Sequence, residues 1–447
     1  MPRDTRRTSD GLPLAPAPLL LGVDVGSTST KAVVIDGTGR EVARASTPTP
    51  FVSRRDRTEM AVDELRAALE TVLAALGDVR RQVASVGFAG MAESGAPFDG
   101  GGHPLAPVIA WHDPRGEEAV ARLEREFGRD LALRIGQPLR PVLTATKVGW
   151  LVAHGAGPVV RWLGVPELCV QALTGAEVTE HSLAARTGCY DVGARRWMPE
   201  VPEALGFAVD VFPSVEPAGA VMGHLASGAI RWTGLPDGIP VTIAGHDHLA
   251  GMAGAGVGPD GLANSVGTAE TIVARLPVPP DLDAALDSRV AISLYPGGRE
   301  WAALVSTVRA GIVVERVAAA LGHAPDKLDR LPGEPVTIDD ELLEDLARHR
   351  TACLPDGPPG DVWAGLLRAM ARRTAEGYGR LTAIAGRRHE MVLFGGGSVS
   401  GPWLQAKAAL LDIAVRQSVG GTAVARGAAI HAGVAAGWWP AADQGPA

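Results

Sequence analysis

The chain has 447 residues, of which 46% are hydrophobic and 21% are charged, and its formal net charge is −8. A chain of this length exceeds one compact core, so two or three domains are expected. The negative balance, with no basic stripe, excludes an extended nucleic-acid footprint, and no apolar run reaches the length of a membrane span. We expect a cytoplasmic protein with neither a nucleic-acid nor a membrane partner.

The ends and the cysteines add two further expectations. Residues 1–18 contain arginines and prolines without an apolar segment, which predicts a disordered leader rather than a secretory signal. Residues 441–447 are expected to form an untethered tail. Cys169, Cys189 and Cys353 are odd in number and widely spaced, which favours reduced thiols over disulfides or a metal site.

The segment Leu20–Asp36 predicts two apolar strands joined by a tight polar turn. Gly26 allows a ligand to approach the backbone, and the hydroxyls and N–H groups of Ser27 and Thr28 can donate to phosphate oxygens. Lys31 adds a positive charge, and Asp24 offers an oxygen ligand for magnesium. The alternative interpretation is an ordinary β-hairpin with a polar turn.

The elements that follow alternate between helical and strand patterns. Apolar residues at helical spacing predict a helix over 62–76 that ends at Gly77. Strands are expected at 83–89, 108–111 and 239–244, with helices at 117–127 and 146–153. This alternation predicts an α/β protein whose sheets are covered by helices.

The second half of the chain repeats the hairpin pattern. Gly267 and Thr268 lie in a turn between two short apolar runs within 261–274. A strand at 301–307, helices at 311–321 and 362–384, and a glycine turn at 395–398 follow. Two related halves predict a nucleotide held between two lobes. We place the lobes at 19–254 and 255–440, with a hinge in the glycine-rich stretch 251–261.

Taken in order, these motifs resemble those of the FGGY family of carbohydrate kinases. The elements that carry the resemblance are Asp24–Ser29, Trp111–Arg115, Thr146–Leu151, Leu173–Gly175 with Ser182, Gly245–Asp247, Val266–Thr268, and Gly395–Ser398 with Gly427–Ala429. The resemblance implies the two-lobed actin/hexokinase/Hsp70-type (ribonuclease H-like) fold, with the nucleotide in the cleft between the lobes. It also implies ATP and Mg²⁺ as cofactors and a sugar hydroxyl as the acceptor.

The resemblance assigns roles to particular residues. Asp247 is the expected catalytic base, because it ends a buried strand and can accept a proton from a sugar hydroxyl. The alternative is that Asp247 only caps the next helix. We expect His246 and His248 on the face opposite Asp247, which argues against zinc, and we place His248 beside the sugar.

The other expected ligand contacts divide between nucleotide and sugar. Those expected for the nucleotide are Gly26, Ser27, Thr28, Lys31, Gly267, Thr268, Gly311, Glu315, Gly396, Gly397 and Gly401. Those expected for the sugar are Glu93, Trp111, Asp113, Arg115, Asp247 and His248. Four of these residues have an alternative interpretation. Glu315 could be a solvated helix position, and Gly401 could lie in a plain turn. Trp111 could belong to the core, and Arg115 could be a surface residue at a helix start.

The chain departs from its relatives at three places. Glu180 stands where many members have aspartate, and Leu410 where an aspartate often precedes the last strand. Ala92-Glu93 replaces the arginine–glutamate pair of glycerol kinases and the methionine–histidine pair of xylulose kinases. Because position 92 lacks arginine, we expect glycerol to be a poor substrate.

The expected activity is ATP-dependent phosphorylation of a small sugar, with a xylulose-like ketopentose as the leading candidate. The alternatives are another sugar, a polyol or an aldonate as acceptor, or a non-catalytic nucleotide sensor of the same fold. The sequence leaves the acceptor and the oligomeric state open, although a homodimer is the usual default for a soluble enzyme.

Overall fold

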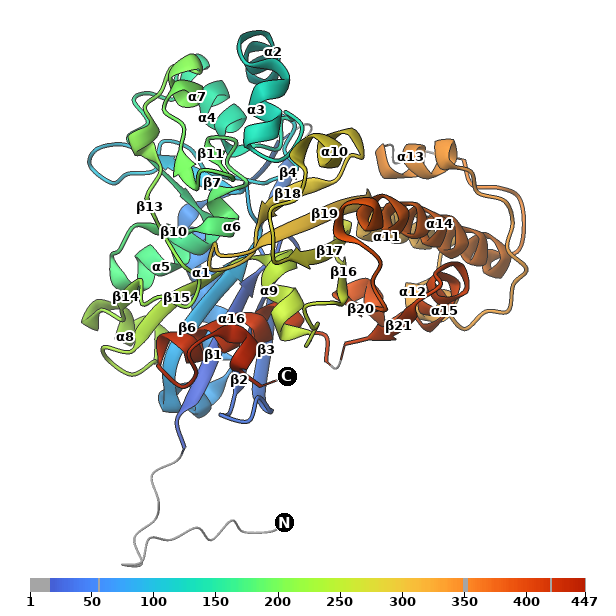
Figure 1. The fold of residues 1–447 in the computed structure, drawn as a ribbon. Coiled ribbons are helices and arrows are strands. Elements are labelled where there is room, and N and C mark those ends of the chain that lie inside the picture. The colour runs from blue at the N-terminus through green and yellow to red at the C-terminus, as the bar shows by residue number, and fades with distance from the viewer. Residues whose placement is uncertain (1–16, 55–56, 349–352, 419, 447) are drawn as a thin grey trace, which may run out of the picture.

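The computed structural model describes residues 17–54, 57–348, 353–418 and 420–446. The predicted leader, 1–18, lies almost wholly outside these residues. Two six-stranded sheets dominate the molecule, and each belongs to one lobe (Figure 1). Within the described residues, no helix combines the length and apolar character needed to cross a membrane.

The first sheet has the strand order β14-β15-β6-β1-β2-β3. Strand β1 pairs with β2 in antiparallel orientation and with β6 in parallel orientation. In sheet order the strands are β14 (Gly223–His224), β15 (Pro240–His246), β6 (Val83–Gly90), β1 (Leu19–Val25), β2 (Ser29–Ile35) and β3 (Glu41–Pro48).

The second sheet has the order β18-β19-β17-β16-β20-β21. Strand β16 pairs with β17 in antiparallel orientation and with β20 in parallel orientation, as β1 does with β2 and β6. The strands are β18 (Ala291–Leu294), β19 (Trp301–Val308), β17 (Glu270–Leu276), β16 (Leu262–Val266), β20 (Glu390–Phe394) and β21 (Ala414–Gln417). The shared pairing confirms the two related halves and the α/β class expected from the sequence.

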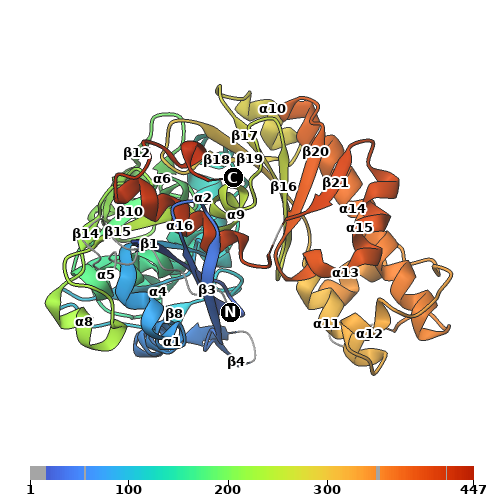
Figure 2. The ribbon, with the colours of Figure 1, turned by 90° about the horizontal axis from the view of Figure 1, so that it is seen from below.

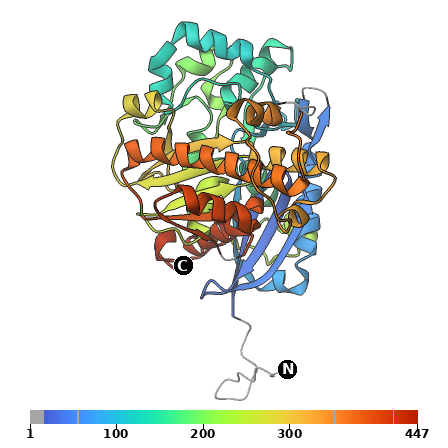
Figure 3. The ribbon, with the colours of Figure 1, turned by 90° about the vertical axis from the view of Figure 1, so that its right-hand side faces the viewer.

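Helices cover both faces of each sheet. Helices α1 (Val62–Ala74), α5 (Val165–Thr174) and α8 (Ser227–Thr233) pack on one face of the first sheet. Helices α11 (Ala310–Ala320), α14 (Pro359–Ala385) and α15 (Gly401–Leu410) pack on the outer face of the second. Figure 3 shows the long α14 running across this face, where it contacts β19 and β17.

The helices α9 (Asp247–Gly254) and α16 (Ala423–Ala435) lie between the two sheets (Figure 2). Glycines let their backbones touch, since a Cβ on Gly254 would lie 1.8 Å from the carbonyl oxygen of Ala423. A Cβ on Gly427 would lie 1.9 Å from the carbonyl oxygen of Ala250. The first four residues of the predicted hinge, 251–254, therefore belong to a tightly packed helix rather than to a flexible connection.

The C-terminal part of the chain differs from the expected division at 440. Helix α16 packs on β1, β6 and β15 of the first sheet, although its sequence falls in the expected second lobe. Residues after Trp439 are also held, because Asp443 forms an ion pair of 3.4 Å with Arg275. The expected untethered tail is therefore held at both ends, by Arg275 of β17 at Asp443 and by Arg426 of α16, which donates to the Pro446 carbonyl oxygen at 3.4 Å.

A third sheet and a helical cap extend the first lobe. The sheet has the order β4-β5-β8-β7-β9, formed by β4 (Val52–Arg54), β5 (Arg57–Met60), β8 (Val108–Ile109), β7 (Gly95–Phe98) and β9 (Arg161–Gly164). The cap helices are α2 (Glu117–Glu126), α3 (Gly128–Arg134), α4 (Thr144–Ala153) and α7 (Glu200–Ala204), which share a separate apolar core. The loop between β8 and α2, which leads into this cap, carries Trp111, Asp113 and Arg115, three of the residues expected at the sugar.

The remaining short elements connect these layers. They are α6 (His181–Ala184), α10 (Leu282–Asp287), α12 (Pro325–Leu328), α13 (Asp340–Arg348), β10 (Val178–Glu180), β11 (Tyr190–Asp191), β12 (Arg196–Trp197), β13 (Ser214–Glu216) and the 3₁₀ turns η1 (Gly77–Gln82), η2 (Val209–Val211), η3 (Gly396–Val399) and η4 (Ala442–Gln444).

Candidate functional site

The two glycine hairpins of the lobes meet tip to tip. The hydroxyl of Thr268 lies 3.0 Å from that of Ser27 and 3.4 Å from that of Thr28. These residues are 240 and 241 positions apart in the sequence, so only the fold brings them together. Converging hydroxyls and turn N–H groups from two sides form a donor-rich site that suits phosphate oxygens.

Asp24 lies at the end of β1, directly opposite Lys31 of β2. Its Oδ1 is buried and has no hydrogen-bond partner. Burial raises the pKa of Asp24 to about 7, although Lys31 lowers it and Asp247 raises it further. An orphaned carboxylate oxygen among phosphate-type donors fits a hard divalent cation such as Mg²⁺.

The predicted glycines of the second lobe surround its hairpin. The Gly311 N–H donates to the carbonyl oxygens of Gly267 and Thr268, at 3.1 and 3.2 Å. A Cβ on Gly397 would lie 2.5 Å from the Val266 side chain. Gly267, Gly311 and Gly397 thus form one cluster, with Gly396 beside them in η3. Glu315 and Gly401 are exposed, and no side-chain bond of Glu315 ties it to this cluster.

A buried ion pair that the sequence analysis missed supports the second hairpin. Lys407 of α15 and Glu270 of β17 have fully buried side chains, and their charged atoms are 2.6 Å apart. Lys407 also donates to Asn264, and Glu270 accepts from the hydroxyls of Thr374 and Thr307. This network fixes β16 and β17 directly below the Gly267–Thr268 turn.

Asp247 is positioned by the way in which β15 ends. Gly245 has a φ of +102°, and a Cβ there would lie 2.4 Å from the Ser182 hydroxyl oxygen, so glycine is required. Ser182 accepts the His246 N–H at 2.9 Å and donates to Glu180. The strand therefore stops at His246, and Asp247 becomes the first residue of α9.

The Asp247 carboxylate has one occupied and one open oxygen. Its Oδ1 accepts the backbone N–H of His248 at 2.7 Å, whereas the N-cap position of α9 is His246 and not Asp247, as the helix-cap alternative assumed. Among the described residues, no group donates to Oδ2, and the side chain is 24% exposed. Burial raises the pKa of Asp247 to about 7. A carboxylate that titrates near neutrality and keeps an open oxygen can serve as a general base.

The expectation that His246 and His248 face away from Asp247 is wrong. The ligating atoms of the three residues lie within 4.8 Å of one another. The His246 Nε2 is 3.2 Å from the Asp247 Oδ1, and the His248 Nδ1 is 3.8 Å away. The extended geometry assumed from the sequence ends at His246, so the alternation of a strand no longer applies. Burial lowers the pKa of His248 to about 4, which keeps its ring neutral.

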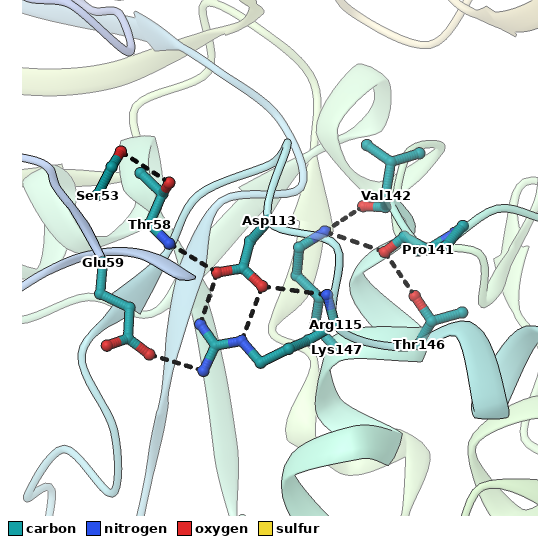
Figure 4. Close-up of polar contacts among 9 residues, drawn as sticks. All are labelled: Ser53, Thr58, Glu59, Asp113, Arg115, Pro141, Val142, Thr146 and Lys147. Atoms are coloured by element: carbon teal, nitrogen blue, oxygen red, sulfur yellow. Dashed lines mark hydrogen bonds and ion pairs between the residues drawn. The ribbon is translucent and has the colours of Figure 1, made fainter. Parts of the chain in front are cut away.

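Asp113 and Arg115 bind each other inside the protein (Figure 4). The Arg115 Nε and Nη2 donate to the two Asp113 oxygens at 2.7 and 2.8 Å, and Arg115 also pairs with Glu59 at 2.6 Å. The Asp113 side chain is fully buried. The surface alternative for Arg115 is excluded, and this geometry favours a supporting role for both residues over the direct sugar contact predicted for them.

Lys147 lies beside this pair and belongs to a motif to which the sequence analysis gave no role. Its ammonium donates to the backbone oxygens of Val142 and Pro141, at 2.5 and 3.3 Å (Figure 4). Burial lowers the pKa of Lys147 to about 8. The lysine thus fixes the loop that precedes α4. Trp111 stands nearby, half-buried, and its backbone N–H donates to the Ser94 hydroxyl oxygen at 2.8 Å.

Glu93 pairs with an arginine that the sequence analysis did not identify. The Arg186 Nε and Nη2 donate to the Glu93 Oε1 at 2.7 and 2.6 Å. An arginine–glutamate pair is therefore present, although position 92 is alanine. The argument against glycerol from position 92 loses its basis. No sequence signal links the two residues, which are 93 positions apart.

The departures at Glu180 and Leu410 have different consequences. Glu180 is buried, and its Oε1 accepts the N–H of Gly297, in the turn between β18 and β19, at 2.9 Å. Glu180 thereby joins the end of β15 to the second lobe, through Ser182 and Gly297. Leu410 is 41% exposed and has no evident role.

The sequence and the fold were compared with known proteins. Residues 19–254 match the model of the FGGY family of carbohydrate kinases, N-terminal domain. A xylulose kinase of Streptomyces rubiginosus is 30% identical, over 96% of this chain and 90% of the relative. An L-fuculokinase of Escherichia coli is 26% identical, over 94% of this chain and 92% of the relative.

Solved structures show the same fold. A xylulose kinase from Lactobacillus acidophilus superposes with a TM-score of 0.81 at 17% identity, covering 96% of this chain and 91% of that one. A gluconate kinase from the same organism gives a TM-score of 0.82 at 16% identity, with coverages of 96% and 91%. These neighbours confirm the two-lobed actin/hexokinase-like fold. With the match over 19–254, they lead to one conclusion: the chain belongs to the FGGY family of carbohydrate kinases, phosphotransferases that act on sugar hydroxyls.

Proposed function

We propose that the protein is an ATP-dependent kinase that phosphorylates a primary hydroxyl of a small polyhydroxy substrate, with a xylulose-like ketopentose as the leading acceptor. The observation that carries this proposal is the open oxygen of Asp247 close to the meeting hairpins. The two sites are close enough for the charge of Asp247 to raise the pKa of Asp24. The full-length similarity to a xylulose kinase supports the choice of ketopentose.

In this mechanism Asp247 takes the proton from the acceptor hydroxyl. The hydroxyl oxygen then forms a bond to the γ-phosphorus of ATP, the bond to the β–γ bridging oxygen breaks, and ADP leaves. Phosphoryl transfer depends mainly on positioning and charge neutralisation. Ser27 and Thr28 from the first lobe and Thr268 from the second donate to the phosphates, and Lys31 neutralises charge.

A divalent cation fits beside Asp24, whose Oδ1 is buried without a partner. Asp24 would hold Mg²⁺ there, and the bound cation would neutralise charge on the phosphates. Gly311, Gly396 and Gly397 bring the backbone of the second lobe close to the nucleoside side, and Glu315 and Gly401 stay predictions for that side. Glu93, Trp111 and His248 are the proposed sugar contacts.

The test is a coupled assay of ADP release with pentuloses, hexuloses, polyols and aldonates, each at saturating ATP and Mg²⁺. We expect the highest specificity constant for a ketopentose. The matched control is Asp247→Asn, which should release ADP at the background rate with every acceptor. No acceptor-dependent ADP from the wild-type protein would contradict the kinase proposal and favour a nucleotide sensor. A preference for an aldonate or a polyol would contradict only the choice of acceptor.

A further inference from the structure

Arg309 lies at the junction between β19 and α11, next to the tip of the second hairpin. Just before it, Val308 pairs with Glu270, the residue at which β17 leaves the hairpin turn. Just after it, the Gly311 N–H donates to the carbonyl oxygen of Thr268 at 3.2 Å. Contacts on both sides thus hold the backbone of Arg309 beside the turn that meets the first lobe.

Arginine is an unfavourable residue for this position in a helix. Arg309 is the N-cap residue of α11, and its side chain makes no capping hydrogen bond. Serine, threonine, aspartate and asparagine are preferred there, because their side-chain oxygens accept an N–H of the first turn. A positive charge at this end also opposes the helix dipole, and the first turn of α11 has no acidic residue to offset it. The stability of α11 therefore does not explain the arginine.

The guanidinium of Arg309 is also unpaired within the part of the chain that the structure describes. No carboxylate or carbonyl oxygen there accepts from it, and the residue is exposed. By contrast, Arg316 in the same helix donates to the Leu346 carbonyl oxygen at 2.6 Å. A guanidinium carries its donors in a planar fork that matches the oxygens of a phosphate group. An unpaired fork beside a phosphate-type turn thus has a ligand of matching chemistry.

The charge of Arg309 also acts on the facing wall of the first lobe. Burial lowers the pKa of His112, and the charge of Arg309 lowers it further. His112 belongs to the loop between β8 and α2, and its ring lies edge-on to that of Trp111, with centroids 5.2 Å apart. The guanidinium therefore lies near both the second hairpin and the loop expected at the acceptor, and the transferred phosphoryl group has to pass between these two.

We infer that Arg309 is a phosphate-binding residue of the second lobe, whose guanidinium donates to the non-bridging oxygens of the γ-phosphoryl group during its transfer. This inference rests on the proposed kinase function and deepens it. As the acceptor oxygen bonds to the γ-phosphorus, the bond to the β–γ bridging oxygen breaks and the hydroxyl proton goes to Asp247. Arg309 exchanges no proton, and it offsets the negative charge on the transferred group, which phosphoryl-transfer enzymes have to stabilise.

The first experiment compares Arg309→Met with the wild-type enzyme. Calorimetry measures the binding of ADP and of the β,γ-imido analogue of ATP, each with Mg²⁺, and steady-state kinetics are measured with the best acceptor. Lost hydrogen bonds to a charged group predict that the analogue binds roughly 10- to 100-fold more weakly and that kcat falls by at least as much. The affinities for ADP, which has no γ-phosphate, and for the acceptor should not change. Equal losses for ADP and the analogue, or a loss confined to the acceptor, would overturn the assignment.

Two further variants test the guanidinium itself. Arg309→Lys keeps the charge but loses the planar fork, so it should recover only part of the turnover. The matched control is Arg368→Met, which removes an exposed arginine from α14 in the same lobe. It should leave the binding of the analogue and the turnover unchanged. Losses in this control as large as those in Arg309→Met would assign the effect to the overall charge of the lobe and overturn the inference.

The stability of a fourth variant separates phosphate binding from a structural role. Arg309→Ser provides a preferred N-cap side chain and removes the charge that opposes the helix dipole. The thermal midpoint without ligands should therefore stay the same or rise, although the analogue binds more weakly and turnover falls. A lower midpoint, with a loss of turnover no larger than the loss of folded protein, would make Arg309 a structural residue and overturn the inference.

The outcomes also separate this inference from the proposed function. A wild type that binds the analogue but shows no acceptor-dependent ADP release would contradict the kinase proposal. The phosphate contact would then still be supported if Arg309→Met weakens the analogue and not ADP. Turnover and analogue binding at wild-type values in Arg309→Met would overturn the contact and leave the kinase proposal intact. A wild type that binds neither ADP nor the analogue would overturn both.

Discussion

The two glycine hairpins share one topology but place their charges differently. In the first hairpin, Asp24 and Lys31 lie opposite each other next to the turn. In the second, the corresponding paired positions hold Ser265 and Thr271, and its charge, Glu270, points inward to Lys407. The first hairpin thus places charged side chains next to its turn. The second hairpin places neutral hydrogen-bond donors there, and a buried ion pair holds its two strands in position.

The largest expected effect comes from removing the proposed base of the first lobe, Asp247. Asp247→Asn keeps the size and the helix-capping ability of the side chain but cannot take up a proton. Turnover should fall by roughly 10²–10⁴-fold, while the affinities for ATP and acceptor and the thermal midpoint stay close to wild type. Near-normal turnover would show that Asp247 is only a helix residue.

The next largest effect is expected for the buried ion pair between Lys407 and Glu270 in the second lobe. Lys407→Met leaves Glu270 buried without its cation, which typically costs about 3–5 kcal/mol of unfolding free energy. Urea unfolding should show this loss. The control is the double variant with Glu270→Leu, which should regain most of the stability, because two apolar residues often replace a buried ion pair without loss. Equal stability of the single variant and the wild type would contradict the proposal that this ion pair holds the strands of the second hairpin in position.

A smaller effect is expected at the tip of the second hairpin. Thr268→Val removes a hydroxyl that we assign to phosphate, and a hydrogen bond to a charged oxygen contributes about 1.5–3 kcal/mol. Calorimetry should show roughly 10- to 100-fold weaker binding of an ATP analogue and unchanged acceptor binding. Thr382→Val, at a half-buried position near the end of α14, is the control. A loss confined to the acceptor would remove Thr268 from the nucleotide site.

The smallest effect is expected at the connection between the lobes. Glu180→Asp shortens the side chain by one methylene, so the carboxylate can keep Ser182 but not reach Gly297. The loss of one hydrogen bond should lower the unfolding free energy by about 0.5–1.5 kcal/mol, with turnover within a few-fold of wild type. A large loss of turnover would show that this contact positions Asp247 more strongly than we infer.

Local patterns in the sequence predicted much of the fold. The turn at Gly26 and its repeat at Gly267 predicted the paired hairpins, and the apolar run before Gly245 predicted the strand that ends beside Asp247. These features depend on neighbouring residues, so a sequence pattern can report them. The same patterns did not show that α16 returns to the first sheet, because an apolar helix face does not specify its partner.

The ion pairs of the candidate site could not be predicted from the sequence, for a related reason. Glu93 and Arg186 are 93 positions apart, and Glu270 and Lys407 are 137 apart. Glu93 was expected at the sugar, but each of the other three charges on its own looks like an ordinary surface residue. The grouping of His246 with Asp247 was missed because it depends on a single residue: the strand ends there, and the helix begins at the next position.

The most direct test of the account is the pH dependence of the transfer step, measured by rapid quench in single turnovers of the wild type and of Asp247→Asn. Burial raises the pKa of Asp247 to about 7, and the base must be ionised to accept a proton, so the wild-type rate should rise with pH through about 7 and then level off. The asparagine variant should be slow and lack this limb. An unchanged limb in Asp247→Asn would assign the titration to another group and contradict the role of Asp247 as the base.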